Sequence, residues 1–359
     1  MDVLKVSGLT EEQKKKYRLL DNKTAEYALW DFDMLHDELE GLDFDGYDFG
    51  FPDLEIDVDP INSGALADKF LVPPFSVIHT TRGAWPQRKK YWLDFGIRSE
   101  LGRDDKLAYS MPDWVSRQAK GTGDGTSVFD PALCELMYRW FSCSGDFVLD
   151  PFAGGSVRGI VGVELGRHYC GVDLRAEQVE ANRANAEEIC TDECPTWVCG
   201  DSCNITTLAQ GEYDFMLTCP PYGDLEQYSD DPNDLSNMDA EDFDNTYREI
   251  LNKTVSMLRD NRFACVVVGN YRDKKGNLRD LVGLTVDAME QAGAKYYNDI
   301  ILVTPAGSLP VRTSRQFPIS RKVGRQHQYV LIFLKGDAKA AVDRLGDVEL
   351  PDMDEYEEE

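Results

Sequence analysis

Short apolar runs alternate with longer amphipathic segments from Phe147 onward. Short apolar runs between polar turns are typical of buried strands, and apolar residues spaced three and four apart are typical of helices. Strands that alternate with helices indicate a parallel sheet covered on both faces. The pattern predicts strands at 147–150, 168–173, 196–199, 213–218, 263–269, 295–303 and 328–334, and helices near 156–166, 176–189, 240–259 and 277–292.

Seven strands of this kind predict an α/β fold with a doubly wound, Rossmann-like sheet, in which a long loop joins the last two strands. Residues 1–60 show short helical patterns instead and form a small N-terminal extension. We divide the chain into an acidic helical segment with a linker (1–60), a basic and aromatic connecting region (61–125), the sheet domain (126–336) and an acidic, disordered tail (337–359).

The composition favours a folded protein that is neither membrane-spanning nor secreted. Of the 359 residues, 42% are hydrophobic, which is enough for a sizeable core. No apolar run approaches the roughly 20 residues of a membrane-spanning helix, and no secretory signal pattern is visible. Nine cysteines without such a signal favour reduced thiols. We therefore expect a cytoplasmic protein with no membrane partner.

The net charge of −27 is segregated along the chain. Residues 1–60 carry 17 acidic and 6 basic side chains, residues 223–250 carry 10 and 1, and residues 337–359 carry 10 and 2. By contrast, residues 82–120 carry 9 basic and 5 acidic side chains, and residues 312–325 carry 5 basic and no acidic ones. The acidic total hides two basic stretches that could contact an anionic partner.

The first predicted strand ends in a glycine-containing turn, DPFAGGS (residues 150–156), which opens a helix. Glycines let the backbone approach a ligand closely, and Asp150 at the strand end can accept a hydrogen bond from an ammonium or hydroxyl group. The chain lacks the phosphate-binding patterns G-x-x-x-x-G-K-[ST] and G-x-G-x-x-G. A zwitterionic adenosyl ligand therefore suits this turn better than a pyrophosphate.

Two further predicted strands end in an acid. Asp173 follows the second strand, where the two hydroxyls of a ribose would lie, and Asp201 follows the third, at the height of an adenine amino group. Either acid could simply be a helix N-cap, and for Asp201 the cap and the ligand contact are equally favoured. The three turns together predict an adenosyl-binding edge, because the carboxyl ends of parallel strands meet at one edge.

The fourth predicted strand ends in TCPPY (residues 218–222). Two successive prolines fix the backbone and remove two amide donors, so the carbonyls of Cys219 and Pro220 are held without ladder partners. A rigid acceptor followed by an aromatic ring suits an extruded base, whose exocyclic amino group would be held while the base stacks on Tyr222. The alternative interpretation is a Pro-Pro turn that only ends a strand.

Together, DPFAGGS and TCPPY resemble motifs I and IV of the amino-methylating DNA methyltransferases, the N4-cytosine/N6-adenine family, over about Ser127 to Lys335. TSVFDP (126–131) matches the family's motif X, and RQHQYVLIF (325–333) is similar to its closing strand, in a gamma-like order. The family usually has Asp, Asn or Ser where this chain has Cys219, which leaves adenine and cytosine both open. Residues 9–51 resemble the end of the ParB-like domains that precede some phage and mobile-element methyltransferases.

The resemblance implies methyl transfer from S-adenosyl-L-methionine to the exocyclic amino group of adenine or cytosine in double-stranded DNA, by base flipping and direct transfer, in a bacterial or phage-infected cell. It implies four catalytic residues, Cys219, Pro220, Pro221 and Tyr222. The implied cofactor-binding residues are Phe129, Asp130, Pro131, Asp150, Pro151, Phe152, Ala153, Gly154, Gly155, Ser156, Asp173 and Asp201. A covalent thiolate on Cys219 is disfavoured, because no helix start or cation adjoins it to lower its pKa.

Two rival interpretations stay open. Methyltransferases of RNA bases or of protein glutamine carry a related Asn-Pro-Pro-Tyr motif, and Cys219 would also suit a catalytically decayed DNA-binding relative. The cations expected to contact DNA are Arg88, Lys89, Lys90, Arg312, Arg315, Arg321, Lys322 and Arg325. For the first three a solvated helix face is equally favoured. The acidic stretch from Asp224 to Asp244 is expected to form a mobile flap.

Four cysteines cluster at positions 190, 194, 199 and 203. Zinc sites usually show cysteine pairs two to four residues apart, so this spacing is permissible. The spacing is nevertheless unlike a zinc ribbon, and Cys199 lies inside a predicted strand. We expect buried thiols and no metal.

Overall fold

The computed structural model describes residues 66, 69–98, 128–191, 193–223, 229–273, 275–307 and 309–350. The chain divides into two compact units, Met1–Pro60 and Ile61–Glu359. The helical segment and the ParB-like resemblance predicted for the first unit lie outside the described residues. All described residues belong to the second unit.

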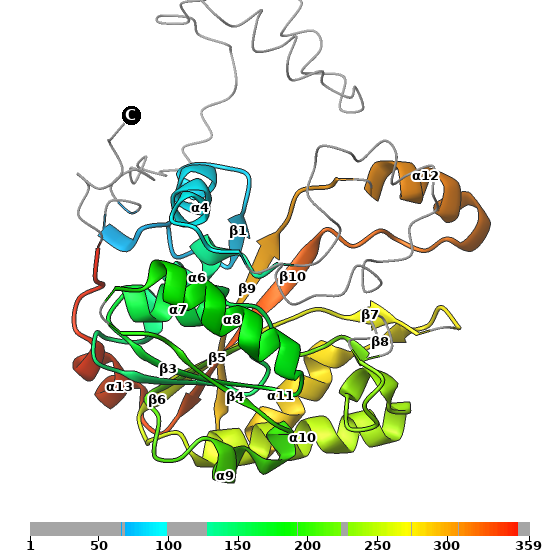
Figure 1. Cartoon of the computed structure of the whole chain (residues 1–359). Coiled ribbons are helices and arrows are strands. Elements are labelled where there is room, and N and C mark those ends of the chain that lie inside the picture. Colours follow the sequence, from blue (N-terminus) through cyan, green and yellow to red (C-terminus); the bar gives the residue numbers. More distant parts are fainter. Residues whose placement is uncertain are drawn as a thin grey trace, which may run out of the picture. The chain divides into compact units, whose positions relative to one another are not determined.

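Eight strands form one sheet in the order β1-β9-β10-β6-β5-β2-β3-β4 (Figure 1). Their bounds are β1 Val77–His79, β2 Phe147–Asp150, β3 His168–Asp173, β4 Thr196–Cys199, β5 Phe215–Thr218, β6 Arg262–Val268, β9 Lys295–Val303 and β10 His327–Lys335. Strand β10 runs antiparallel to both of its neighbours, and the other pairs in this sheet are parallel. The predicted Rossmann-like α/β sheet is confirmed, with one strand more than the seven expected.

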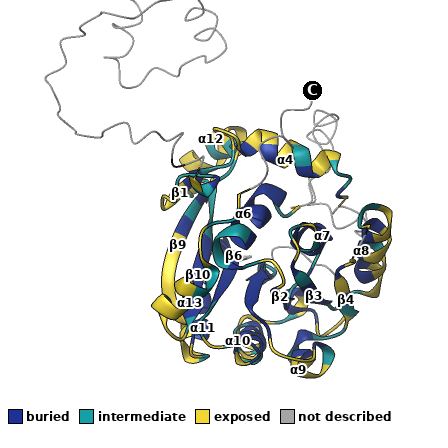
Figure 2. Cartoon of the chain, turned by 90° about the vertical axis from the view of Figure 1, so that its left-hand side faces the viewer, coloured by how far each residue is buried: buried dark blue, intermediate teal, exposed yellow. Residues whose placement is uncertain are grey.

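Helices cover both faces of the sheet. Side chains of a strand alternate between faces, so Val148 and Leu149 of β2 enter different hydrophobic clusters. The cluster of Val148 includes residues of α4 (Trp85–Asp94), α6 (Pro131–Phe141), α7 (Val157–Glu164) and α8 (Ala176–Ile189), and the cluster of Leu149 includes residues of α10 (Ala240–Ser256) and α11 (Leu281–Gln291). Strands β2, β5 and β6 are largely buried between these helices, as their apolar sequences require, whereas the first five residues of β9 are exposed (Figure 2).

The extra strand comes from the region expected to be a connector. Strand β1 pairs in parallel with the end of β9, with Val77 opposite Ile301. Helix α4 follows it and buries Trp85 and Trp92 in the same core as the sheet. The described residues of 61–125 are therefore part of the sheet-containing unit.

Several other elements are short or stand apart from the sheet. They are the 3₁₀ helix Ser202–Asn204, α9 (Ile205–Leu208), the 3₁₀ helix Leu235–Asn237, the hairpin of β7 (Tyr271–Arg272) and β8 (Leu278–Arg279), and α12 (Leu309–Ser320). Helix α12 occupies the long connection predicted between the last two strands. It buries none of its residues and stands beyond the ends of β9 and β10 (Figure 1).

The C-terminal segment differs from the disordered tail expected at 337–359, because residues Ala338–Leu345 form helix α13. Asp337 caps this helix by accepting a hydrogen bond from the amide of Ala340 at 2.9 Å. Arg344 pairs with the buried Asp146, with its Nη1 3.0 Å from Oδ2. A buried carboxylate needs such a partner, which ties the helix to the start of β2.

Candidate active site

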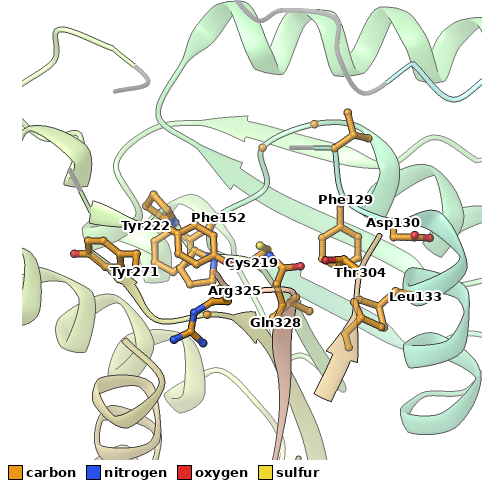
Figure 3. A pocket seen from close by; sticks show the side chains of 18 of the residues that line it. Phe129, Asp130, Leu133, Phe152, Cys219, Tyr222, Tyr271, Thr304, Arg325 and Gln328 are labelled. Carbon is orange, nitrogen blue, oxygen red and sulfur yellow. Dashed lines mark hydrogen bonds between the residues drawn. The ribbon is translucent and has the colours of Figure 1, made fainter. Parts of the chain in front are cut away.

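A cavity of about 1390 Å³ opens at the carboxyl edge of the sheet. Strands β2, β3, β4 and β5 are parallel, so the turns that follow them meet at this edge. Figure 3 shows side chains from several of these turns converging on the cavity. The residues predicted from the sequence that line it are Phe129, Asp130, Pro151, Phe152, Gly154, Gly155, Asp173, Asp201, Cys219, Pro220, Pro221 and Tyr222.

The glycine turn and the double-proline corner follow adjacent strands. Strand β2 pairs with β5, with Val148 opposite Phe215 and Leu149 opposite Met216. The strand order reverses at β2, since the chain continues from there to β3 on one side and later returns to β5 on the other. Ligands of open α/β sheets bind at such a switch point.

The glycine turn places backbone beside open space. Gly154 has a φ of +51°, which favours glycine, and a Cβ there would meet nothing within 4 Å. Its amide donates to Oδ2 of Asp173 at 2.9 Å, and its carbonyl accepts from Nδ2 of Asn182 at 2.7 Å. Ala153 and Ser156 are buried behind the turn and do not line the cavity.

Asp150 lies beneath the turn and does not reach the cavity. It is fully buried, and both carboxylate oxygens accept two hydrogen bonds each. Oδ1 accepts from the amide of Phe152 (3.1 Å) and Oγ1 of Thr218 (2.6 Å), and Oδ2 accepts from Nε of Arg158 (2.6 Å) and the hydroxyl of Tyr169 (2.8 Å). The carboxylate predicted to meet a ligand therefore holds the turn against β3 and β5 instead.

Asp173 presents a carboxylate to the cavity at the end of β3. Its Oδ1 accepts a hydrogen bond from the amide of Arg175, and its Oδ2 accepts one from the amide of Gly154, each at 2.9 Å. Burial raises the pKa of Asp173 to about 6, against the opposing effect of these amide hydrogen bonds. Asp201 caps a 3₁₀ helix by accepting from the amide of Cys203 at 2.8 Å, and it also lines the cavity. A capping role and a contact with a ligand are therefore compatible for Asp201.

The segment before α6 forms another wall. Asp130 caps α6, accepting from the amide of Ala132 at 3.0 Å, and also accepts from Nε1 of Trp85 and Nζ of Lys89, each at 3.2 Å. Phe129 faces the cavity beside it (Figure 3). Pro131 begins the helix, is buried and does not line the cavity.

The corner after β5 contributes all four of its predicted catalytic residues to the cavity. The hydroxyl of Tyr222 accepts a hydrogen bond from Nε2 of Gln328 at 2.8 Å. The ring of Tyr271 meets the ring of Tyr222 edge-on, with their centroids 6.4 Å apart. Gly269 lies next to the tyrosine, since a Cβ there would be in van der Waals contact with its ring and hydroxyl at 3.7 Å. Tyr222 is therefore held in one orientation from β10 and β7.

Sequence reasoning missed several residues that line the cavity, among them Arg158, Tyr271 and Gln328. Tyr271 and Gln328 lie far along the chain from Tyr222, and no local pattern connects them. A signal did exist for Arg158, which is the only charged residue among the first seven positions of the otherwise apolar helix VRGIVGVE. A single arginine in such a helix indicates a buried ion pair.

The predicted DNA-contacting cations divide into two groups. Lys89, Lys90, Arg312, Lys322 and Arg325 line the cavity, whereas Arg88, Arg315 and Arg321 do not. Arg88 is buried, with its Nη2 2.7 Å from Oε1 of Glu135. Burial opposes ionisation of Glu135, but Arg88 and the hydrogen bonds to it lower the pKa of that carboxyl. Arg88 is therefore a structural residue and is unavailable to DNA.

The acidic stretch after Tyr222 has a structural explanation in its described part. Residues 224–228 of the expected flap lie outside the described residues. Further on, Asp234 accepts from the amide of Ser236 at 2.9 Å, and Asp239 caps α10 by accepting from the amides of Glu241 and Asp242. Carboxylates at helix starts accept hydrogen bonds from the free amides and interact favourably with the positive end of the helix dipole.

The four clustered cysteines do not converge. The thiol of Cys190 lies beside Cys194, whereas Cys203 lies beside Asp201. Burial is the main reason that the pKa values of Cys190 and Cys203 rise to about 12. Within the described ranges, no group of three or more His, Cys, Asp or Glu side chains is arranged to hold a metal ion.

Comparison with solved structures shows distant likenesses. TrmN from Thermus thermophilus is 15% identical with a TM-score of 0.39, over 58% of this chain and 49% of that one. Magnesium protoporphyrin IX methyltransferase from Synechocystis PCC 6803, solved with bound SAM, is 14% identical with a TM-score of 0.39, over 65% and 98%. A methyltransferase from Pyrococcus furiosus is 16% identical with a TM-score of 0.36, over 62% and 95%.

A search of curated proteins finds no match to the chain. None of the described helices is both long and apolar enough to span a membrane. The family described as DNA methylase, which comprises N6 and N4 methyltransferases, matches residues 68–184 and 213–358. The match includes both the glycine turn and the double-proline corner. The chain therefore belongs to this DNA methylase family, whose members use S-adenosyl-L-methionine to methylate amino groups of DNA.

Proposed function

We propose that this chain transfers a methyl group to the exocyclic amino group of adenine or cytosine in double-stranded DNA, directly and on a base turned out of the helix. One observation carries the proposal. The glycine turn after β2 and the double-proline corner after β5 follow adjacent strands and line one cavity. A methyl donor on the first turn and an extruded base on the second would therefore share one cavity.

Residues at the carboxyl ends of β2, β3 and β4 suit the cofactor. Gly154 offers backbone beside open space, and Asp173 offers a carboxylate to the two hydroxyls of a ribose. Asp201 lines the same cavity and would accept from an adenine amino group. When bound, S-adenosylmethionine supplies an electrophilic methyl group, and the task of these residues is to fix its position.

The residues of the corner suit a flat base with an amino group. Tyr222 offers a ring for stacking, and Gln328 and Tyr271 hold that ring. Among the described residues no backbone amide donates to the carbonyl of Pro220, and we assign this oxygen to the amino group of the base. The contact would draw the nitrogen toward tetrahedral geometry. Holding the reacting atoms in line can supply up to ~7–11 kcal/mol of the barrier.

The proton leaves the nitrogen after it has gained the methyl group, so the chemistry needs no strong base. Cys219 lies at the cavity beside Pro220, where the family usually has Asp, Asn or Ser. A thiol is a weak hydrogen-bonding group. The rigid carbonyl of Pro220 therefore becomes the main polar contact that we assign to the base.

Cations at the mouth of the cavity suit a DNA backbone. Lys89 and Lys90 lie on α4, Arg312 lies on α12, and Lys322 and Arg325 follow α12 before β10 begins. Turning a base out of the stack costs a few kcal/mol, which phosphate contacts must offset.

The test is transfer of tritiated methyl groups from S-adenosylmethionine to duplex DNA, to RNA and to protein, followed by single-molecule sequencing of DNA from a methylation-deficient strain that expresses the chain. We expect label in duplex DNA, on N6 of adenine or N4 of cytosine at one sequence context. Label in RNA or protein alone would overturn the choice of substrate. Cofactor binding without transfer to DNA containing all short sequence contexts would indicate a decayed relative.

A further inference from the structure

The glycine turn contains a buried cation with one donor group to spare. The side chain of Arg158 is 4% exposed and rises from the first turn of α7. Its Nε donates to Asp150, and its Nη2 donates to the carbonyls of Phe152 (2.6 Å) and Ala153 (2.9 Å). Among the described residues Nη1 makes no hydrogen bond. This atom is not fully buried, however, so it faces the cavity that Arg158 lines.

The neighbours of Arg158 hold the guanidinium group rigidly. Asp150 is saturated by four hydrogen bonds and fixes one edge of the group. The ring of Phe129 covers a face, with its centroid 4.6 Å from Cζ. A guanidinium so fixed loses little entropy when it binds a further acceptor.

The start of α7 adds a second attraction for an anion at the same place. Ser156 precedes the helix, but its side chain makes no cap, because its hydroxyl donates to Oδ1 of Asn185 at 2.8 Å. Uncapped first-turn amides and the helix dipole favour negative charge. Gly154 and Gly155, which precede the helix, both line the cavity.

We propose that Arg158 binds the carboxylate of the methionine part of S-adenosylmethionine. The sequence instead predicts a contact between Asp150 and an ammonium or hydroxyl group of the ligand. The carboxylate is the only anionic group of that molecule. Phosphates of duplex DNA cannot reach a side chain that is 4% exposed and lies beneath Phe129. The zwitterion brings its own ammonium group, so its carboxylate can approach the Arg158–Asp150 pair without adding net charge to the site.

This inference rests on the family's cofactor and not on which base is methylated. The first experiment leaves the protein unchanged. Isothermal calorimetry on the full chain, without DNA, compares S-adenosylmethionine with decarboxylated S-adenosylmethionine. We expect the decarboxylated compound to bind about 10- to 100-fold more weakly, the usual effect of losing a hydrogen bond between charged groups. The difference should persist between 50 and 300 mM salt, since a buried contact is little screened.

A variant assigns the effect to the arginine. Arg158→Gln combined with Asp150→Asn removes both charges of the buried pair, so that neither is left alone. In this variant we expect the two compounds to bind equally. Lys339→Gln, which removes an exposed cation on α13 that does not line the cavity, should keep the full discrimination. Circular dichroism and a thermal melt verify folding. If the double variant does not fold, Arg158→Lys replaces it, because lysine keeps the charge but not the planar guanidinium. This variant should lose most of the discrimination.

The outcomes separate this inference from the proposed function. Equal affinity of the unaltered chain for both compounds would overturn the role of Arg158 and leave the methyltransferase assignment standing. Discrimination that survives in a folded Arg158 variant would place the carboxylate on another group. Failure of the unaltered chain to bind S-adenosylmethionine at all would instead contradict the proposed function.

Discussion

Tyr222 is the residue on which base contact depends most. Removing its ring in Tyr222→Ala takes away the stacking surface, worth about 1–3 kcal/mol per base, and frees the corner around it. We expect methyl transfer to fall to background while the affinity for S-adenosylmethionine stays within a few-fold. A tritium transfer assay and calorimetry measure the two quantities separately.

A milder change tests how Tyr222 is held. Gln328→Leu removes the donor to its hydroxyl but keeps the ring, and Tyr222→Phe removes the acceptor. Both should raise KM for DNA more than they alter cofactor affinity, and the double variant should be no worse than either alone, because the two residues share one hydrogen bond. Full activity of Tyr222→Ala would contradict the pocket assignment altogether.

Asp173 should make cofactor binding depend on pH. Only the ionised carboxylate accepts hydrogen bonds from both ribose hydroxyls, and burial raises its pKa to about 6. Protonation therefore competes with the ligand, and affinity should be constant above about pH 7 and fall as the pH drops through 6. Calorimetry between pH 5 and 8 measures this. Asp173→Asn should bind more weakly and lose the pH dependence, and a pH-independent affinity in the unaltered chain would refute the ribose contact.

At the scale of single residues, the sequence predicted which positions gather at the cavity better than what each one does there. Asp150 and Arg88 both looked available to a ligand. Some of the partners that satisfy them come from distant positions: Thr218 is 68 positions from Asp150, and Glu135 is 47 positions from Arg88. A buried network of this kind becomes visible only when the sheet is assembled.

Helix α12 stands beyond the ends of β9 and β10 (Figure 1), and it should carry part of the DNA affinity. Each phosphate contact releases counterions, so the affinity falls as salt rises, with a slope of about 0.9 per contact in logarithmic units. Replacing Arg312, Lys322 and Arg325 with Gln should weaken binding of all duplex sequences alike and lower this slope by about one per lost contact. Fluorescence anisotropy from 50 to 300 mM salt measures both.

The control for this set is Lys339→Gln, a charge change on the exposed side of α13. It should leave the salt slope unchanged. A slope that is the same in the triple variant and in the unaltered chain would remove α12 and its C-terminal loop from the DNA interface.

Elements with a strong pattern were predicted well, and elements without one were not. Strands β2 and β3 have the predicted bounds, because each is a short apolar run between polar turns. Strand β1 has three residues, too few to show alternation, and it exists only because the end of β9 offers a free edge. Helix α12 contains Pro318 and exposes its apolar residues, so it has neither the composition nor the buried stripe from which a helix is recognised.

At the scale of the whole molecule, charged side chains tie the C-terminal helix α13 to the amino ends of two central strands. Asp146 and Asp214 are buried at the amino ends of β2 and β5, and Arg344 of α13 reaches both. Burial opposes ionisation of Asp214, but hydrogen bonds from Arg259 and Arg262 lower its pKa below the ordinary value. The segment expected to be a disordered tail therefore neutralises charge that the core has buried.

Helix α13 should for that reason contribute to stability. Arg344→Met leaves Asp146 buried without its cation, which should lower the free energy of unfolding by about 1–3 kcal/mol. The matched substitution Lys339→Met, on the exposed face of the same helix, should change it by less than about 0.5 kcal/mol. Urea unfolding followed by circular dichroism measures both. A solvated tail would make the two substitutions equally neutral, because a helix that only rests in solvent has no buried charge to satisfy, and that result would remove α13 from the folded core.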